Sequence, residues 1–208
     1  MKRLLAILLA FIMVVGFSGC SDDEKKTSSK PSAQKKNDSY EGIVSGNKYE
    51  NYKLKLGCEL PAGWSFHTKK EIEEINKQAT DAANSQLTED LKNADLIYAM
   101  SAYSSDNSAT VKVILEKKSQ LSDLEALAKN TVLATKNAYG ELIKSAIVSK
   151  TDIKNRSFVS TDISFLSGPT TIYTKTLYDV CDGYLVCITI TAKSQNTVDN
   201  LVKEFYLL

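Results

Sequence analysis

The side chains that could perform acid–base or nucleophilic chemistry in this sequence are few and widely spaced. His67 is the single histidine, and Ser65 lies two residues before it in a short extended segment, 64–66. Alternate residues of an extended segment point to the same side, but a serine and a histidine without a third, orienting group do not make a catalytic triad. The Gly-x-Ser-x-Gly pattern of a nucleophile elbow does not occur. The sequence therefore predicts no catalytic residue, and His67 is interpreted as a residue beside a helix cap.

Metal and phosphate ligands are equally sparse. Metal sites need clustered histidine, cysteine or carboxylate groups, and neither Cys-x-x-Cys nor His-x-x-x-His spacing is present. A glycine-rich phosphate loop is absent. Glu71, Glu73 and Glu74 are neighbours, but acidic residues in the first turn of a helix favour its dipole, which explains them without a ligand. We predict no metal and no cofactor, leave ligand-binding residues unknown, and expect that the protein is not an enzyme.

The cysteines support a prediction about strand register. There are four of them: Cys20, Cys58, Cys181 and Cys187. The pair Asp182-Gly183 is a strong signal for a two-residue hairpin turn, which would place Cys181 opposite Tyr184 and Tyr178 opposite Cys187. The two sulfurs would then point to opposite faces of the sheet, so we predict no bridge between them. A three-residue bulged loop would shift the register and reopen that bridge. Apart from Cys20, we expect buried or half-buried free thiols.

Residues 1–19 have the pattern of a secretory signal peptide. Lys2 and Arg3 precede an apolar run over 4–17, which is shorter than the roughly 20 residues that span a bilayer. The closing residues, Phe17-Ser18-Gly19-Cys20, resemble the lipobox of bacterial lipoproteins, with Phe17 where leucine is usual. This resemblance implies acylation of Cys20 and a lipid anchor on the extracytoplasmic face of the cell membrane. The alternative is an ordinary signal peptide that ends near a cysteine.

Residues 20–51 are predicted to be a flexible tether, and residues 52–208 a single domain. The tether region is rich in Ser, Lys, Asn and Gln and has too few apolar residues to offset the entropy of ordering. Thirty flexible residues would hold the domain on the order of 30 Å from the membrane. The net charge of the chain is +1, from 26 basic and 25 acidic residues, so no basic excess indicates nucleic acid.

Hydrophobic patterns predict the elements of the domain. Strands are expected at 52–60, 64–66, 95–103, 109–117, 145–153, 157–166, 170–181 and 184–192. Helices are expected at 68–84, from 122 to about 140, and at 196–206, with a short helical turn at 87–93. Thr68 with Glu71 and Ser122 with Glu125 are capping boxes, and Gly140 is a helix terminator. The buried stripe of the last helix is expected to comprise Val198, Leu201, Val202 and Phe205.

This order of elements predicts an α+β fold in which helices flank an antiparallel sheet. Together with the run Leu60-Pro61-Ala62-Gly63-Trp64-Ser65-Phe66, the order resembles the PsbP-like fold, an α-β-α sandwich, over about 51–208. That fold is shared by a photosystem II extrinsic subunit, a Ran-binding nuclear import factor and several bacterial lipoproteins. The resemblance implies a non-enzymatic accessory or binding role.

We therefore predict an extracytoplasmic binding or accessory module, held to the membrane by its lipid and engaging an unknown protein or small ligand. One alternative is an enzyme of unrecognised type, such as a hydrolase, with a cleft that joins His67 to carboxylates or a thiol. The other is a purely structural envelope lipoprotein. Trp64 is expected to anchor the core. Five strand tyrosines could bind a glycan or peptide by stacking if their rings gather at a groove: Tyr98, Tyr103, Tyr173, Tyr178 and Tyr184. Burial of these rings against helices would exclude that role.

Overall fold

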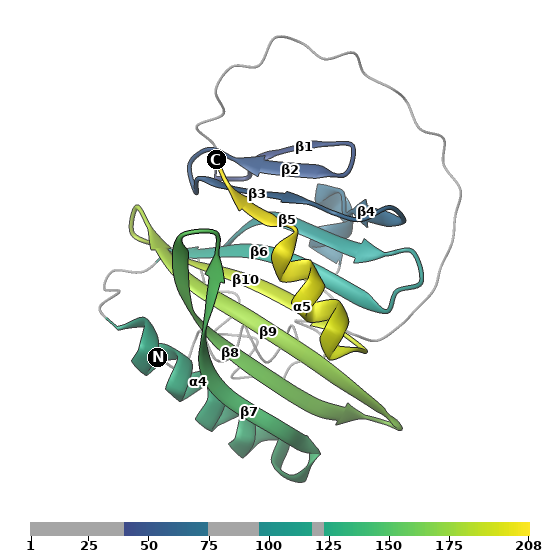
Figure 1. Ribbon diagram of the computed structural model, residues 1–208, viewed down its shortest axis with the longest axis vertical. Helices are drawn as coiled ribbons and strands as arrows, with labels where there is room; N and C mark the ends of the chain where they lie inside the picture. Colours follow the sequence, from purple (N-terminus) through teal and green to yellow (C-terminus); the bar gives the residue numbers. More distant parts are fainter. Residues whose placement is uncertain (1–39, 75–95, 118–122) are drawn as a thin grey trace.

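The computed structural model describes residues 40–74, 96–117 and 123–208, and their strands form two antiparallel sheets (Figure 1). The small sheet has the order β1 (Ile43–Ser45), β2 (Lys48–Asn51), β3 (Leu56–Glu59) and β11 (Phe205–Leu207). The large sheet has the order β4 (Trp64–Phe66), β5 (Leu96–Ser104), β6 (Ala109–Lys117), β10 (Tyr184–Ala192), β9 (Thr170–Cys181), β8 (Arg156–Ser167) and β7 (Ile143–Ile153). The predicted signal peptide, Cys20 and the helical turn at 87–93 lie outside the described residues.

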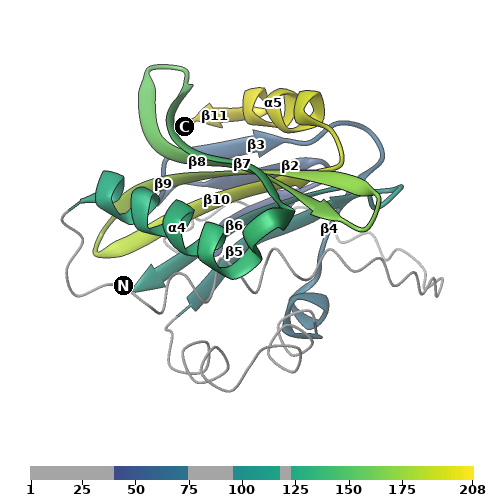
Figure 2. The same ribbon diagram turned by 90° about the horizontal axis from the view of Figure 1, so that it is seen from below.

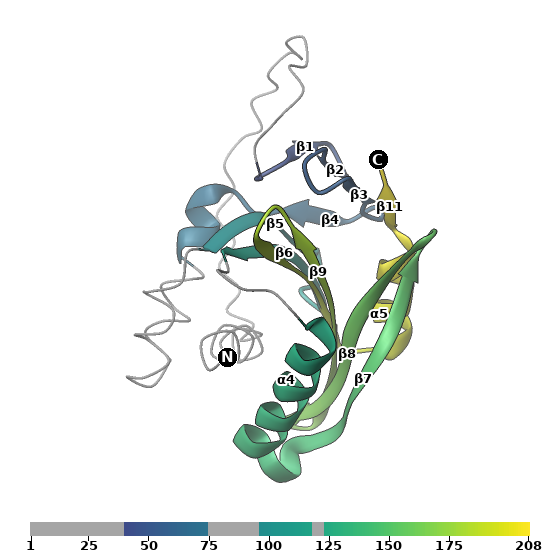
Figure 3. The ribbon, with the colours of Figure 1, turned by 90° about the vertical axis from the view of Figure 1, so that its left-hand side faces the viewer.

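Helices cover the large sheet on both faces. Helix α4 (Leu124–Tyr139), followed by the 3₁₀ turn η1 (Gly140–Leu142), packs on one face of β7 and β8, and α5 (Gln195–Lys203) lies with the small sheet on the other face (Figures 2 and 3). The largest cluster of buried side chains, which we call the main core, comes from both sheets and α5. Successive residues of β9 point to opposite faces of the large sheet, because Leu177 belongs to the main core and Tyr178 is buried beneath α4. The α+β class is confirmed. The layer opposite α4 combines a helix with a second sheet, so the arrangement is not a sandwich of helices around one sheet.

The folded domain begins earlier than the sequence indicated. Strands β1 and β2 lie within residues 20–51, the predicted tether, and Tyr49 and Asn51 are fully buried. The Asn51 side chain donates a hydrogen bond to the Tyr40 carbonyl at 2.8 Å, so the domain already includes Tyr40. The polar composition of this region led to the prediction of a tether. Only two residues of β1 and β2 are buried, Tyr49 and Asn51, so the strands have no apolar pattern that the sequence could reveal. The strand predicted at 52–60 is correspondingly shorter, because the chain turns at 52–55 before β3.

The C-terminal helix is shorter than predicted. Helix α5 ends at Lys203, and β11 then pairs with β3, placing Phe205 opposite Cys58. All four residues of the expected apolar stripe are buried, but Phe205 is buried as a strand residue. The helical period predicts which side chains are buried here. The helical period cannot show that residues 205–207 leave the helix and pair with β3 as a strand.

The caps of the helices follow the sequence closely. The first capping box is confirmed: the Glu71 carboxylate accepts the Thr68 backbone N–H at 2.6 Å, and the Glu71 N–H donates to the Thr68 hydroxyl at 3.3 Å. The second box is wrong by one residue, because Asp123 is the N-cap of α4 and accepts the Ala126 N–H at 2.9 Å. Gly140 ends this helix with a φ of 50° and donates its N–H to the Lys136 carbonyl.

Replacing Asp123 with alanine should lower the free energy of unfolding by about 1 kcal/mol, because one backbone N–H at the start of α4 loses its acceptor. Urea denaturation followed by circular dichroism measures this change. Asp123→Ser keeps an acceptor oxygen at the same place and should recover most of the loss. Equal loss in both variants would contradict the assignment of Asp123 as the cap.

The β9–β10 hairpin has the predicted register. Asp182 and Gly183 have φ values of 48° and 78°, the left-handed values that a type I′ turn requires. Cys181 lies opposite Tyr184, and Tyr178 lies opposite Cys187. The two sulfurs therefore point to opposite faces, with Cys187 packed in the cluster beneath α4 and Cys181 against the main core. Cys58, Cys181 and Cys187 form no disulfide with one another.

Strand β7 lies at the margin of the large sheet, with β8 as its neighbour in that sheet. It is 11 residues long, and its pairing with β8 is interrupted by a β-bulge between Ile143 and Ser145. Lys144 and Lys150 are exposed along it, and the Ile147 side chain is 54% exposed. Among the described residues, the strand thus combines an edge without a second partner strand with an irregularity and two positive charges.

Candidate functional site

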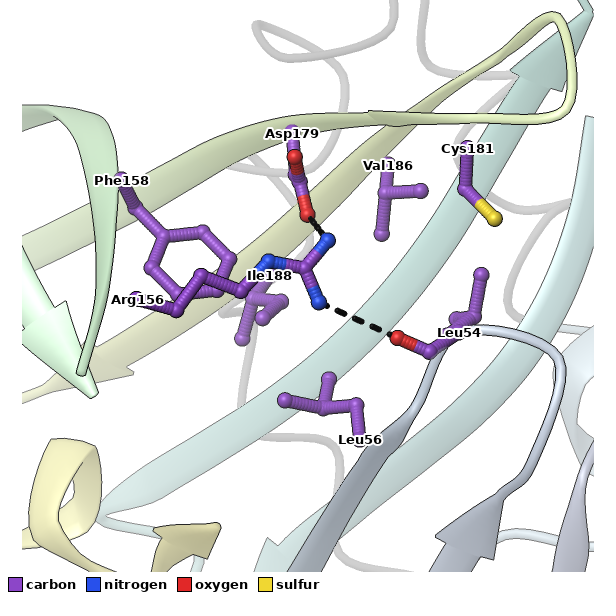
Figure 4. A pocket seen from close by; sticks show the side chains of 8 residues that line it. All are labelled: Leu54, Leu56, Arg156, Phe158, Asp179, Cys181, Val186 and Ile188. Carbon is purple, nitrogen blue, oxygen red and sulfur yellow. Dashed lines mark hydrogen bonds and ion pairs between the residues drawn. The ribbon is translucent and has the colours of Figure 1, made fainter. Parts of the chain in front are cut away.

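A groove lies at the seam where the small sheet meets the large one, and Figure 4 shows its inner end. Its volume is about 720 Å³, and it is lined by Lys53, Leu54, Lys55, Arg156, Cys181, Asp182, Leu207 and Leu208. An inner void of about 10 Å³ adjoins it and is lined by Leu54, Leu56, Arg156, Phe158, Asp179, Cys181, Val186 and Ile188. We call the two together the seam groove. Its walls come from the β2–β3 turn, the start of β8, the end of β9 and the C-terminal residues.

Arg156 joins the two sheets at the inner end of the seam groove. Its guanidinium donates to the carbonyl of Leu54, in the β2–β3 turn of the small sheet, at 3.2 Å and forms an ion pair with Asp179 on β9 (Figure 4). The guanidinium carbon also lies 5.2 Å from the centre of the Phe158 ring. The Arg156 and Asp179 side chains are 31% and 24% exposed, so both charges are partly removed from water. The pair closes the inner end of the seam groove.

The outer rim of the seam groove carries charges of both signs beside leucine side chains. Lys53 lies 4.0 Å from the Asp182 carboxylate and 4.7 Å above the Tyr40 ring. Among the described residues, Lys55 forms no ion pair. With Arg156, the lining contains three cationic side chains against the carboxylates of Asp179 and Asp182. The Leu208 N–H donates to the Lys55 carbonyl at 3.2 Å, which also brings the carboxyl end of Leu208 beside Lys55.

Cys181 lines both parts of the seam groove, and its thiol donates to the Lys53 carbonyl at 3.5 Å. Burial raises the pKa of this thiol, and the neighbouring carboxylates of Asp182 and Asp179 raise the pKa further. Since the thiolate is the nucleophilic form, Cys181 is a weak nucleophile at neutral pH. The seam groove therefore offers apolar contacts, fixed charges and a protonated thiol.

His67 lies elsewhere, in a separate depression of about 160 Å³ beside β4 and β5. Its Nδ1 atom is 3.0 Å from the Ser101 hydroxyl, and its ring packs 4.5 Å from the Tyr103 ring. The imidazole is thus held by Ser101 on β5 and not by Ser65, which the sequence places nearest. The neighbouring Glu71 carboxylate is engaged with Thr68, as the helix cap requires. The position of His67 beside the cap is confirmed.

The titration of His67 should affect stability near neutral pH. Burial lowers the pKa of His67 below the unfolded value of 6.5, against the opposing effect of Glu71. At pH values between the pKa of His67 in the folded protein and its pKa in the unfolded chain, the unfolded chain binds more protons. The free energy of unfolding should therefore fall as the pH decreases from about 7. It should level off once the pH is below the pKa of the folded protein. Urea titrations at a series of pH values between 5.5 and 7.5 measure this dependence. His67→Gln should flatten it, because no other histidine titrates in this range. An unchanged slope would contradict the prediction.

The strand tyrosines do not gather at one groove. Tyr178 is buried beneath α4, and burial raises its pKa. Tyr173 and Tyr184 pack against the main core on the other face of the large sheet, while Tyr103 stacks on His67. Tyr98 lines the depression beside His67. The five rings therefore do not form a single stacking surface. Trp64 is partly buried against the main core, as expected of a core anchor.

Sequence reasoning also missed a polar network on β7, β8 and β9. Lys175 forms an ion pair with Asp162 and donates to the Thr151 hydroxyl at 3.3 Å. The Thr151 hydroxyl lies 2.9 Å from that of Ser160, which lies 2.7 Å from that of Ser149, and Ser149 donates to Asp162. These five side chains form a closed ring, which we call the hydroxyl ring. Each polar group has a partner within the ring, so the ring stabilises the strand register.

The described residues contain neither a cluster of metal ligands nor a membrane-spanning helix. Within 40–74, 96–117 and 123–208, no three His, Cys, Asp or Glu side chains gather as a metal site would require. No helix in the same ranges is both long and apolar enough to cross a bilayer. Nothing in the sequence marked the seam groove except the alternation of Lys53, Leu54 and Lys55, which also describes an ordinary exposed turn.

Comparisons with known proteins add one structural similarity. No protein-family model matches the chain, and no curated protein sequence matches it. The structure is similar to the crystal structure of LpqN, described as involved in cell envelope biogenesis of Mycobacterium tuberculosis. The TM-score is 0.40 at 12% sequence identity, over 73% of this chain and 82% of that chain. A similarity of this degree assigns neither a family nor a residue role to the chain.

Proposed function

We propose that this protein is a lipid-anchored, extracytoplasmic binding or accessory module whose ligand or partner occupies the seam groove. The observation that carries the proposal is the seam groove itself, whose volume of about 720 Å³ falls within the range of ligand sites. Leu207 and Leu208 supply apolar surface, and a few charged groups lie beside them. Such a lining is typical of sites that bind and orient a ligand.

The chemistry of the seam groove supports binding rather than catalysis. The Arg156 guanidinium is already satisfied by Asp179 and Leu54, and the Cys181 thiol has a raised pKa. Arg156 and Asp179 fix charged groups in the wall of the groove, and neither Arg156 nor Cys181 would exchange a proton near neutral pH. The non-enzymatic role that the PsbP-like resemblance implies is part of the same proposal.

The location is proposed from residues 1–20. A basic start, an apolar run and the lipobox-like ending support export, cleavage before Cys20 and acylation of its thiol. Metabolic labelling with a fatty-acid analogue tests this directly. The parent chain should incorporate the label and Cys20→Ser should not. Labelling of both chains would overturn the anchor at Cys20.

Site-specific photo-crosslinking in intact cells tests the binding role. A photoreactive amino acid at position 208 would lie in the seam groove, where the Leu208 side chain is 42% exposed. The matched control is position 133 on α4, where the Leu133 side chain is 59% exposed and outside the seam groove. A defined adduct from position 208 and none from position 133 is the expected result. No adduct at 208, or the same adduct at both positions, would overturn the proposal.

A further inference from the structure

We infer that the outer face of the small sheet is a docking site for an arginine side chain that a partner protein presents. The site consists of Glu50, Tyr52, Glu59 and Tyr206, and we call it the tyrosine–glutamate patch. None of these residues lines the seam groove, so the inference does not depend on the proposed function. It follows from a planar aromatic surface that lies beside more carboxylates than cations.

The Tyr206 ring lies flat on the outer face of the small sheet. Tyr206 pairs with Gly57, and Gly57 pairs with Glu50, so the three residues form one row across β11, β3 and β2. Cys58 and Tyr49, which alternate with them along the strands, belong to the main core, so the row points away from it. Gly57 is nevertheless buried, and a Cβ atom at this position would lie 2.3 Å from the Tyr206 ring. The ring therefore covers Gly57 with one face and turns the other away from the sheet.

Hydrogen bonds hold the two tyrosines of the patch in place. The Glu50 carboxylate accepts the Tyr52 hydroxyl at 2.9 Å and the Tyr206 hydroxyl at 3.4 Å. Burial, together with the nearby carboxylates of Glu50 and Glu59, raises the pKa of Tyr206 to about 12, so its hydroxyl keeps its proton at neutral pH. The Tyr52 side chain is 38% exposed and extends the aromatic surface beside Glu50. Side chains that are already fixed lose less conformational entropy when a partner binds.

The patch has an excess of negative charge. Lys48 forms an ion pair with Glu59 at 3.1 Å, so these two charges balance. Among the described residues, no cation forms an ion pair with Glu50. Lys55 lies in the lining of the seam groove, beside the carboxyl end of Leu208. One lysine against two glutamates gives the patch a formal charge of −1, which complements a single cation.

A guanidinium fits this arrangement better than an ammonium. A guanidinium is planar and weakly hydrated, so it stacks on aromatic rings, and its N–H donors point outwards in its own plane. Stacked on Tyr206, it would direct these donors toward Glu50 and Glu59 at the margin of the ring. A lysine ammonium is a strongly hydrated point charge and gains less from the ring face. Arginine and tyrosine are both enriched at protein–protein interfaces, which favours a protein as the source of the guanidinium.

An NMR titration of the full chain, in micelles of a neutral polyoxyethylene detergent, tests the inference. The probes are three capped tripeptides at equal ionic strength: Gly-Arg-Gly, Gly-Lys-Gly and Gly-citrulline-Gly, whose side chain is planar but uncharged. The arginine peptide should shift the amide signals of Gly57 and Tyr206 saturably, and it should bind at least about fivefold more tightly than the lysine peptide. The citrulline peptide should give no saturable shift.

A charge-neutralising substitution identifies the carboxylate. Glu50→Gln keeps an acceptor oxygen for the tyrosine hydroxyls and should weaken binding of the arginine peptide about tenfold. Glu141→Gln, which removes an exposed carboxylate on η1, is the matched control and should leave the affinity unchanged. Equal affinity for the arginine and lysine peptides, or saturable binding of the citrulline peptide, would overturn the guanidinium class. Binding that survives Glu50→Gln would overturn the site.

Discussion

Replacing Lys175 with methionine is expected to lower the free energy of unfolding by about 3 kcal/mol, the largest effect of any single substitution proposed here. The Lys175 and Asp162 side chains are only 12% and 22% exposed. Methionine fills a similar volume but leaves the Asp162 carboxylate ionised in a poorly hydrated position, where it has lost its counter-charge. Urea unfolding followed by the fluorescence of Trp64, the single tryptophan, measures the change.

The double variant Lys175→Met/Asp162→Leu is the control for this prediction. It removes both charges, so no ionised group remains buried, and it should cost less than Lys175→Met alone. Ser149 loses its bond to Asp162 in this variant but keeps its contact with Ser160. A double variant less stable than the single one would show that the hydroxyl ring stabilises through the ion pair itself and not by avoiding an unpaired charge.

Arg156→Ala should lower the free energy of unfolding by about 2 kcal/mol, because it removes the residue that joins the two sheets. The change deletes the ion pair with Asp179, the hydrogen bond to the Leu54 carbonyl and the contact with the Phe158 ring. It also leaves the partly buried Asp179 carboxylate without a cation. Equilibrium urea unfolding gives the size of the loss.

Arg156→Lys separates charge from geometry. A lysine keeps the positive charge near Asp179 but cannot reach two acceptors with the planar fork of a guanidinium, so it should recover only part of the loss. Hydrogen exchange provides a second measurement, because backbone amides of β3 should exchange faster in Arg156→Ala if the small sheet separates locally from the large one. Exchange that accelerates uniformly across the chain would contradict the role of Arg156 in joining the sheets.

The long strands were predictable because their sequences carry both the pattern and the turns. Bounds at 170–181 and 184–192 match β9 and β10, since Asp182-Gly183 fixes a two-residue turn between alternating apolar runs. The ion pair of the hydroxyl ring was within reach of the same reasoning. A turn that sets Ser167 opposite Thr170 also sets Asp162 opposite Lys175, as the observed register of β8 and β9 shows.

The short strands and the seam groove could not be predicted in this way. Strands β1, β2 and β11 have three or four residues, and they exist because partner strands lie beside them in space. In the seam groove, Arg156 donates to a carbonyl 102 residues earlier in the chain. Single-sequence patterns describe local periodicity, so they contain no information about such a pairing. The misplaced cap of α4 has a different cause, because Ser122 and Asp123 are both good capping residues and the box pattern favoured the wrong one.

Strand β7, at the edge of the large sheet, affects how copies of the protein behave at high concentration. In the described part of the chain only β8 pairs with this strand of 11 residues, so its other edge is a template onto which a neighbouring chain could add, and an exposed Ile147 would favour such aggregation. The bulge after Ile143 breaks the regular spacing of that template, and Lys144 and Lys150 would bring like charges together when two copies met. Many copies could therefore stand side by side without fusing their sheets, since the strand most able to recruit a neighbour also carries the features that repel one.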